Sequence, residues 1–299
     1  MAASNLNGVG TALVTPFKNG VIDREALITI IRYNLNEGID FLVPLGTTGE
    51  TSTLDDYECR QVLDILLETN EDKVPLVCGM FARNNTRSVI DAILSADLHG
   101  FHSLLLASPY YNKPSQAGLV AHFNAIADVS PLPIVLYNVP SRTAVTINAE
   151  SILELAEHPN IISVKEASGD FNIIMQVLKH KPKDFTMLSG DDMLTLPMIA
   201  CGASGVISVI SNAFPGIFSK AVHAALEDKN DQAKLLFDKL LDVHKWLYIE
   251  GNPVGIKACL EILGYCSSDV RLPLVPLSTS NKQNLAASIK TSKIVNRKL

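Results

Sequence analysis

Short apolar runs alternate with amphipathic stretches along most of this chain, and this alternation constrains its fold more than any other feature. The apolar runs have the length and composition of buried strands, and the stretches between them carry a helical period. Strands that alternate with helices predict βαβ units and a parallel sheet. The eight predicted strands are Gly10–Phe17, Phe41–Leu45, Val74–Gly79, Ser103–Ser108, Ile134–Asn138, Ile161–Glu166, Phe185–Ser189 and Gly205–Ser208.

Eight such units predict an α/β chain folded as a closed (β/α)8 TIM barrel. The predicted strands around residues 104–106 and 134–136 are apolar at every position, as strands covered on both faces should be. The alternative is an open, doubly wound sheet, which usually carries a glycine-rich turn after its first strand. Here the segment Thr15–Gly20 contains no GxGxxG pattern, which favours the barrel.

The strand pattern stops after Glu227, and only helical patterns follow it. These later helices are predicted at Asp231–Glu250, Val254–Leu263 and Thr279–Val295. We therefore predict a catalytic barrel over residues 1–228 and a helical C-terminal extension over residues 229–299. Within the barrel, Asp23 is a predicted helix N-cap, and Gly38 and Gly100 are predicted helix ends.

Composition and charge exclude several classes of partner. The formal net charge is -6 and the pI is about 5.6, which gives no electrostatic reason to expect nucleic-acid binding. No apolar run approaches the roughly 18 residues of a membrane span, and the first residues lack the pattern of a signal peptide. The five scattered cysteines form no CxxC pair, so we expect reduced thiols in a cytoplasmic protein.

Lys165 lies near the end of the predicted strand Ile161–Glu166. Burial there would favour the neutral amine, which is a nucleophile that can form a Schiff base with a carbonyl compound. The alternative is a lysine whose stem packs while its ammonium reaches solvent or a carboxylate. This segment alone favours the structural interpretation.

The other strand ends shift this balance, because a (β/α)8 barrel has its active site at the C-terminal ends of its strands. The loop after the second strand offers the hydroxyls of Thr47 and Thr48, although such a loop can also be a simple polar turn. Tyr111 follows the fourth strand, Tyr137 lies at the end of the fifth, and Arg142 follows the fifth. A phenol can relay a proton, and a guanidinium can bind a carboxylate. Together with Lys165, this set suits imine formation with an oxo acid.

Metal and serine-hydrolase chemistry have little support in the sequence. Of the seven histidines, only His99 and His102 are close in sequence, and they lie at a helix-to-strand junction. That junction belongs to the opposite end of the barrel from the active site, so we expect a structural role. No GxSxG elbow is present. We expect no metal site.

Four motifs resemble the dihydrodipicolinate synthase branch of the N-acetylneuraminate lyase superfamily. They are Gly46-Thr47-Thr48-Gly49-Glu50, Tyr110-Tyr111-Asn112-Lys113-Pro114, Tyr137-Asn138-Val139-Pro140-Ser141-Arg142 and Lys165-Glu166-Ala167. The resemblance runs from about Gly8 to about Leu263. It implies a pyruvate-dependent class I aldolase on a (β/α)8 barrel, commonly a homotetramer, in which Lys165 forms the Schiff base with pyruvate.

The resemblance also implies roles for the other strand-end residues. Tyr137 relays protons to and from the imine, and Thr47 connects it to Tyr111, which reaches in from a neighbouring subunit. Thr47 and Thr48 hold the pyruvate carboxylate, and Arg142 meets the carboxylate of the second substrate, aspartate 4-semialdehyde. Ile207, whose carbonyl lies near the imine, and Gly190 complete the expected substrate-binding set.

The expected reaction is the condensation of pyruvate with L-aspartate 4-semialdehyde to 4-hydroxy-tetrahydrodipicolinate, in the diaminopimelate route to lysine. It needs no cofactor, because the protonated imine is the electron sink. The alternative is a lyase that acts on N-acetylneuraminate or a sugar-derived 2-oxo acid, and a non-catalytic ligand-binding barrel is a third hypothesis. Arg142 and the pair Tyr110-Tyr111 favour the synthase.

The chain departs from the family pattern where lysine-inhibited members carry a recognisable set of residues. Two positions that are commonly histidine in the inhibited bacterial enzymes are Asp56 and Cys59 here, and residues 79–85 depart from the usual GTGxN pattern. We predict that feedback inhibition by lysine is weak or absent. Ala144 replaces a glycine that is usual after Arg142-Thr143, and we expect only a local effect on the backbone.

Overall fold

The computed structural model describes residues 6–81, 83–292 and 294. Its contacts group the chain into two compact units. The first unit contains Pro75–Ile207 together with the start of the chain up to Asn7. The second contains Gly8–Val74 and Ser208–Leu299.

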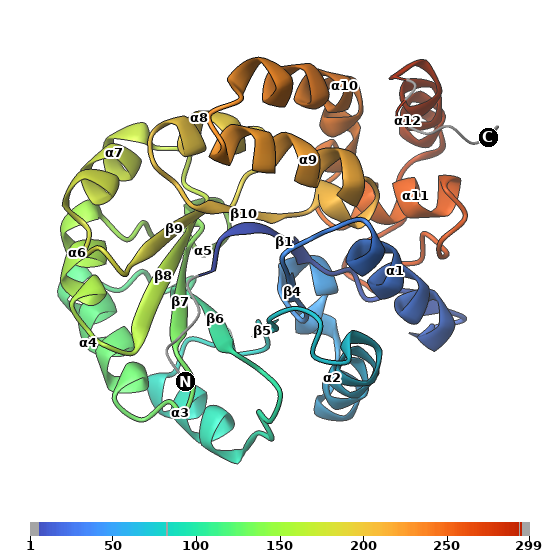
Figure 1. Cartoon of the computed structure of the whole chain (residues 1–299). Helices are drawn as coiled ribbons and strands as arrows, with labels where there is room; N and C mark the ends of the chain where they lie inside the picture. Colours follow the sequence, from blue (N-terminus) through green and yellow to red (C-terminus); the bar gives the residue numbers. More distant parts are fainter. Residues whose placement is uncertain (1–5, 82, 293, 295–299) are drawn as a thin grey trace. The chain divides into compact units, whose positions relative to one another are not determined.

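The first unit is built on parallel strands that pair in chain order. Six helices connect them, and Figure 1 shows α4, α6 and α7 in succession along the outer side of β7–β9. The strands are β5 (Val77–Cys78), β6 (Ser103–Ala107), β7 (Ile134–Asn138), β8 (Ile161–Glu166), β9 (Thr186–Ser189) and β10 (Gly205–Ser208). The helices are α3 (Thr86–Ser95), α4 (Gln116–Ala127), α5 (Pro140–Thr143), α6 (Ala149–Ala156), α7 (Phe171–His180) and α8 (Thr195–Ala200).

The register between β7 and β8 decides which side chains share a face. Tyr137 is paired with Lys165, and Asn138 is paired with Glu166. Because successive residues of a strand point to opposite faces, Tyr137 and Lys165 lie on one face of the sheet. Asn138 and Glu166 lie on the other.

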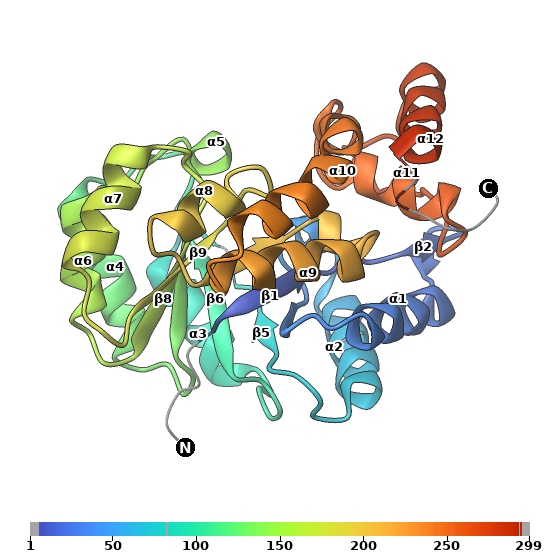
Figure 2. The ribbon, with the colours of Figure 1, turned by 45° about the horizontal axis from the view of Figure 1, so that its top comes forward.

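The second unit carries a parallel pair of strands, a short antiparallel hairpin and the helices of the C-terminal extension. Strand β1 (Gly8–Ala12) pairs with β4 (Phe41–Val43), and β2 (Phe17–Lys18) pairs with β3 (Val21–Ile22). The α-helices are α1 (Arg24–Asn36), α2 (Asp56–Asn70), α9 (Pro215–Leu226), α10 (Asn230–Tyr248), α11 (Val254–Ile262) and α12 (Thr279–Ser292). The 3-10 helices are η1 (Thr47–Gly49), η2 (Thr51–Thr53) and η3 (Ile210–Asn212). Figure 2 shows α10, α11 and α12 packed beside one another.

The predicted alternation of strands and helices is confirmed, and three strands have the predicted bounds: β7, β8 and β10. Two of the three predicted caps are present. Asp23 accepts a hydrogen bond from the backbone N of Ala26 at 3.1 Å, and Gly38, with a φ of 84°, follows the end of α1. The predicted helix end at Gly100 was wrong, since α3 ends at Ser95 with Ala96 as its C-cap, and Gly100, with a φ of 83°, lies in a later turn. The predicted strand Val74–Gly79 was too long, since only Val77–Cys78 pairs, and the hairpin at Phe17–Ile22 was missed.

The C-terminal extension is helical, as predicted. Its last helix is described to Ser292, and the predicted end at Val295 lies outside the described residues. The boundary between residues 228 and 229 stays a prediction. Among the helices of the described residues, none combines the length and the apolar character that crossing a membrane requires.

Candidate active site

Lys165 and Tyr137 form the centre of the candidate site in the first unit. Lys165 is only 5% exposed, and its Nζ lies 4.4 Å from the centroid of the Tyr137 ring. The paired register of β7 and β8 places the two side chains next to each other. A π face attracts a cation at this distance, so the ring stabilises the buried ammonium or a protonated imine formed from it. The predicted combination of an amine with a neighbouring phenol is therefore present.

A set of hydrogen bonds around Asn138 and Glu166 lies on the opposite face of β7 and β8 from Lys165 and Tyr137. Asn138 donates from Nδ2 to Oε2 of Glu166 at 2.8 Å, and Ser168 donates from its backbone N to Oε1 of Glu166 at 2.6 Å. The amide of Asn138 also exchanges two hydrogen bonds with the backbone of Ile147, at 3.0 and 3.1 Å. These bonds fix which end of the amide faces Glu166, so the carboxylate meets two donors. Burial nevertheless raises the pKa of Glu166 above its ordinary value.

Gly190 follows β9 and packs directly against Lys165. A Cβ at this position would lie 2.6 Å from the Cβ of Ala167 and 3.2 Å from Cε of Lys165. The backbone N of Gly190 donates to the carbonyl of Glu166 at 2.7 Å. Only glycine permits this approach, because any larger side chain would displace the stem of the lysine. Sequence reasoning assigned Gly190 to substrate binding, and the structure shows its packing against the lysine.

Three further predicted residues lie in the first unit. Ile207 is buried in β10, and Arg142 is exposed on the single turn of α5. Tyr111 is 87% exposed and has a φ of 70°, a left-handed conformation that is uncommon for a tyrosine. Two hydrogen bonds between Asn84 and the backbone of Tyr110 hold the loop just before Tyr111. Ala144 is also left-handed, with a φ of 59°, which accounts for the glycine that the family usually places there.

Thr47 and Thr48 lie in the second unit, on the 3-10 turn η1. The backbone N of Gly49 donates to the carbonyl of Gly46 at 3.0 Å, and that of Glu50 donates to the carbonyl of Thr47 at 3.1 Å. Thr47 is exposed, whereas Thr48 is buried. Asn252, from the C-terminal extension, donates from Nδ2 to Oγ1 of Thr48 at 2.9 Å.

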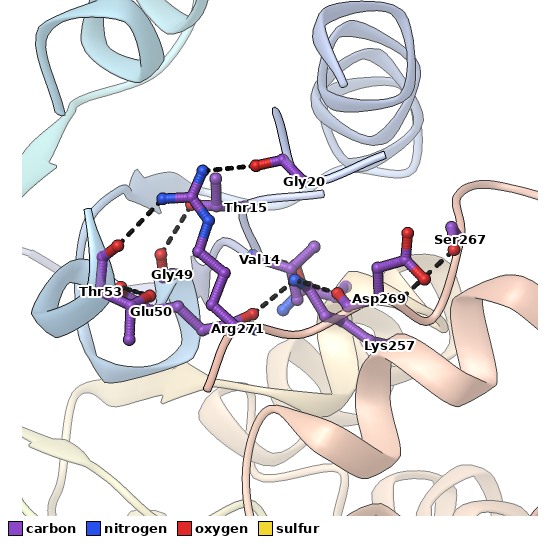
Figure 3. Close-up of polar contacts among 11 residues, drawn as sticks. Val14, Thr15, Gly20, Gly49, Glu50, Thr53, Lys257, Ser267, Asp269 and Arg271 are labelled. Atoms are coloured by element: carbon purple, nitrogen blue, oxygen red, sulfur yellow. Dashed lines mark hydrogen bonds and ion pairs between the residues drawn. The ribbon is translucent and has the colours of Figure 1, made fainter. Parts of the chain in front are cut away.

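Figure 3 shows a polar network around Glu50 that the sequence reasoning missed. Glu50 forms an ion pair with Lys257, and the guanidinium of Arg271 binds the carbonyls of Gly20 and Thr53 at 2.9 Å each. One signal could have revealed it: Lys257 is the only charge in the otherwise apolar stretch from residue 253 to residue 260. A lone lysine in such a stretch needs a buried partner.

The structure thus describes two groups of predicted residues. Lys165, Tyr137 and Gly190 contact or closely approach one another in the first unit. Thr47 and Thr48 belong to the second unit, and the union of the two groups in one site stays a prediction. Among residues 6–81, 83–292 and 294, no three His, Cys, Asp or Glu side chains are grouped so that they could hold a metal ion.

A chain of alternating strands and helices with a buried lysine against a tyrosine ring has the features of a lysine-dependent aldolase of the barrel class. Comparison with known proteins identifies the family to which the chain belongs. The dihydrodipicolinate synthetase family matches residues 5–292. The chain belongs to this family.

Relatives and solved structures agree with that assignment. A 4-hydroxy-tetrahydrodipicolinate synthase of Cytophaga hutchinsonii is 43% identical over 272 residues, 91% of each chain, and one of Koribacter versatilis is 46% identical over 281 residues, 94% of each chain. The dihydrodipicolinate synthase of Thermotoga maritima superposes with a TM-score of 0.93 at 35% identity, over 97% of this chain and 99% of that one. A monomeric dihydrodipicolinate synthase variant gives the same score and identity over 97% of both chains. This likeness confirms the predicted (β/α)8 barrel with its C-terminal helical extension.

Proposed function

We propose that this lyase joins pyruvate to L-aspartate 4-semialdehyde through an imine on Lys165. The synthase activity is that of the family and of curated relatives that are 41–46% identical. The observation that supports the residue assignment is the buried Nζ of Lys165, 4.4 Å from the Tyr137 ring centroid. The amine of Lys165 is therefore shielded from bulk water and lies beside Tyr137, the proposed proton donor.

The proposed reaction proceeds in balanced steps. The neutral amine of Lys165 attacks the C2 carbonyl of pyruvate, and water leaves as the imine forms. Loss of a methyl proton gives an enamine, whose carbon attacks the aldehyde, and the resulting alkoxide takes up a proton. The amino group of the second substrate then attacks the imine carbon, which closes the ring and releases Lys165. Tyr137 carries protons in these steps.

The remaining residues have proposed roles in binding and relay. Thr47 and Thr48 bind the pyruvate carboxylate, and Thr47 also passes protons between Tyr137 and Tyr111. Arg142 binds the carboxylate of the aldehyde substrate, for which a guanidinium is well suited. Gly190 supports this scheme because its lack of a side chain leaves room for the stem of Lys165.

We further propose a cytoplasmic homotetramer without a metal or organic cofactor. The adjacent side chains of Tyr110 and Tyr111, 44% and 87% exposed, support a subunit contact at this loop, because aromatic side chains are enriched at protein–protein interfaces. The imine itself supplies the electron sink, so the chemistry of the proposed steps calls for no further group.

Borohydride trapping tests the imine. Incubation with pyruvate and borohydride should attach a reduced adduct to Lys165, as read by peptide mass spectrometry. The adduct should be absent in Lys165→Ala and retained in Lys179→Ala, a matched exposed lysine on α7. If the wild-type protein forms no adduct, the imine mechanism is wrong. An assay with aspartate semialdehyde and, separately, N-acetylmannosamine tests the substrate, and turnover of the latter alone would favour the sugar-acid alternative.

A further inference from the structure

The C-terminal extension holds the loop of Thr48 through an ion pair that is closed to solvent. Lys257 on α11 binds Oε1 of Glu50, and the two side chains are 0% and 1% exposed. Lys257 also donates to the carbonyl of Asp269 at 2.8 Å and lies 4.1 Å from the centroid of the Phe17 ring. The other oxygen of Glu50 accepts from the backbone N of Arg271 at 3.0 Å (Figure 3). Each charge is thus satisfied by several partners, as a buried ion pair requires.

Glu50 is the residue between the two 3-10 turns η1 and η2 of this loop. It has φ 54° and ψ 32°, a left-handed conformation that is strained for a non-glycine residue. Its backbone N donates to the carbonyl of Thr47, and its carbonyl accepts from the backbone N of Thr53 at 2.9 Å. The ion pair therefore fixes the one residue that joins η1, which carries Thr48, to η2.

A second contact reaches Thr48 itself. Asn252 precedes α11 and donates from Nδ2 to Oγ1 of Thr48 at 2.9 Å. A hydroxyl that accepts a hydrogen bond from an amide keeps its own hydrogen free to donate. With the Nδ2 end of Asn252 toward it, the Thr48 hydroxyl keeps its hydrogen available for a carboxylate ligand.

We propose that Asn252 and Lys257 are positioning residues for Thr48 and, through it, for the carboxylate of pyruvate. This inference rests on the proposed function, in which Thr48 binds that carboxylate. Asn252 sets the direction of the Thr48 hydrogen, and Lys257 fixes the turn through Glu50. The C-terminal extension is then a working part of the pyruvate subsite.

A merely structural role makes a different prediction. If the two contacts only stabilise the fold, their loss lowers the free energy of unfolding and leaves the kinetic constants of the folded fraction unchanged. A positioning role raises the KM for pyruvate and leaves the KM for aspartate semialdehyde within about twofold of the wild type. The difference between the two KM values is therefore the decisive measurement.

Asn252 variants test the first contact. Asn252→Ala should raise the KM for pyruvate about fivefold to tenfold, the usual effect of losing one hydrogen bond between neutral groups. Asn252→Asp should raise it further, because the new carboxylate would accept the Thr48 hydrogen and repel pyruvate. Asn281→Ala is the matched control, since the side chain of Asn281, in the same extension, donates to the exposed Glu250. Folded Asn252 variants with a wild-type KM for pyruvate would overturn the proposal.

The ion pair needs a double variant, because Lys257→Met alone strands a buried carboxylate and should unfold the protein. Glu50→Gln/Lys257→Met removes both charges, and we expect it to fold and to need several times more pyruvate for half-maximal borohydride trapping. The control is Glu261→Gln/Lys282→Met, a partly exposed pair on the same extension. A folded Glu50→Gln/Lys257→Met protein with wild-type trapping would refute the role of Lys257.

Thr48→Val distinguishes the proposed carboxylate role of Thr48 from the proposed positioning role of Asn252. If it raises the KM for pyruvate while the Asn252 variants do not, the carboxylate role of Thr48 stands and the positioning inference fails. If Thr48→Val leaves the KM for pyruvate unchanged, the carboxylate role is wrong and the inference falls with it. The borohydride adduct on Lys165 would still form in that case, so the imine mechanism would survive.

Discussion

At the scale of single residues, the proposed mechanism places two opposing requirements on Lys165. Its amine must be shielded enough to lose its proton, and it must still be reached by a carbonyl carbon. In the structure the side chain of Lys165 is 5% exposed, and a tyrosine ring lies beside its amine. A directly paired carboxylate would favour the charged, unreactive form. The nearest acid along the chain, Glu166, points to the opposite face of β8 and is occupied by Asn138 and Ser168.

The hydroxyl of Tyr137 and its aromatic ring should make separate contributions, which a single substitution can distinguish. Tyr137→Phe keeps the aromatic face over which Lys165 lies and removes only the hydroxyl. We expect kcat to fall about 100-fold or more, as for the loss of a general acid–base group, while borohydride trapping with pyruvate still reaches completion, more slowly. Steady-state assays measure the change, and Tyr110→Phe, on an exposed loop, is the control. A near-normal kcat would remove Tyr137 from the mechanism.

At the scale of elements, the sequence pattern predicted those strands whose bounds depend on neighbouring residues alone. Strands β7 and β8 were predicted with the observed bounds because both are short, mainly apolar runs that end at polar residues. The hairpin at Phe17–Ile22 was missed because two-residue strands carry no periodic signal, and the single turn of α5 is too short for one. The pair Glu50–Lys257 was missed for another reason: 207 residues separate its members, and a glutamate in a polar loop resembles any surface residue.

A second ion pair ties the extension to a helix, and its pH dependence follows from one pKa. Arg271 binds both carboxylate oxygens of Glu58, in the first turn of α2, at 2.5 and 2.6 Å. The hydrogen bonds from Arg271 lower the pKa of Glu58 below its ordinary value of 4.5. A lowered pKa means that the folded protein favours the ionised form. The stabilisation is therefore fully present above about pH 4.5 and is lost as the pH falls through the folded-state pKa.

Glu58→Gln should accordingly destabilise the protein in a pH-dependent way. We expect the free energy of unfolding to fall by about 1–3 kcal/mol at pH 7, because a charge-assisted bidentate contact with little exposure is lost. The deficit should shrink below pH 4. Urea unfolding at the two pH values measures both effects. Glu68→Gln, which removes a largely exposed pair with Arg24, should change little. An equal deficit at both pH values would show that the ionised form of Glu58 is not what stabilises the contact.

At the scale of the whole molecule, family membership identifies the reaction, while the response to lysine stays a prediction. The dihydrodipicolinate synthase of Cyanidioschyzon merolae, 34% identical over 97% of this chain with a TM-score of 0.91, has been solved with lysine bound. We expect inhibition by lysine to depend on the side chains at the lysine site, and this chain differs from the inhibited bacterial enzymes at Asp56 and Cys59.

Asp56 and Cys59 stand where the inhibited bacterial enzymes commonly have histidines. Asp56 is exposed in the first turn of α2, whereas Cys59 is 4% exposed and so offers a ligand almost no surface. Neither supplies the imidazole of the inhibited enzymes, so we predict that lysine at about 1 mM leaves the rate unchanged. Coupled kinetics and calorimetry check this, with the synthase of Cyanidioschyzon merolae as the positive control for binding. Inhibition of this chain at sub-millimolar lysine would show that other residues build the regulatory site.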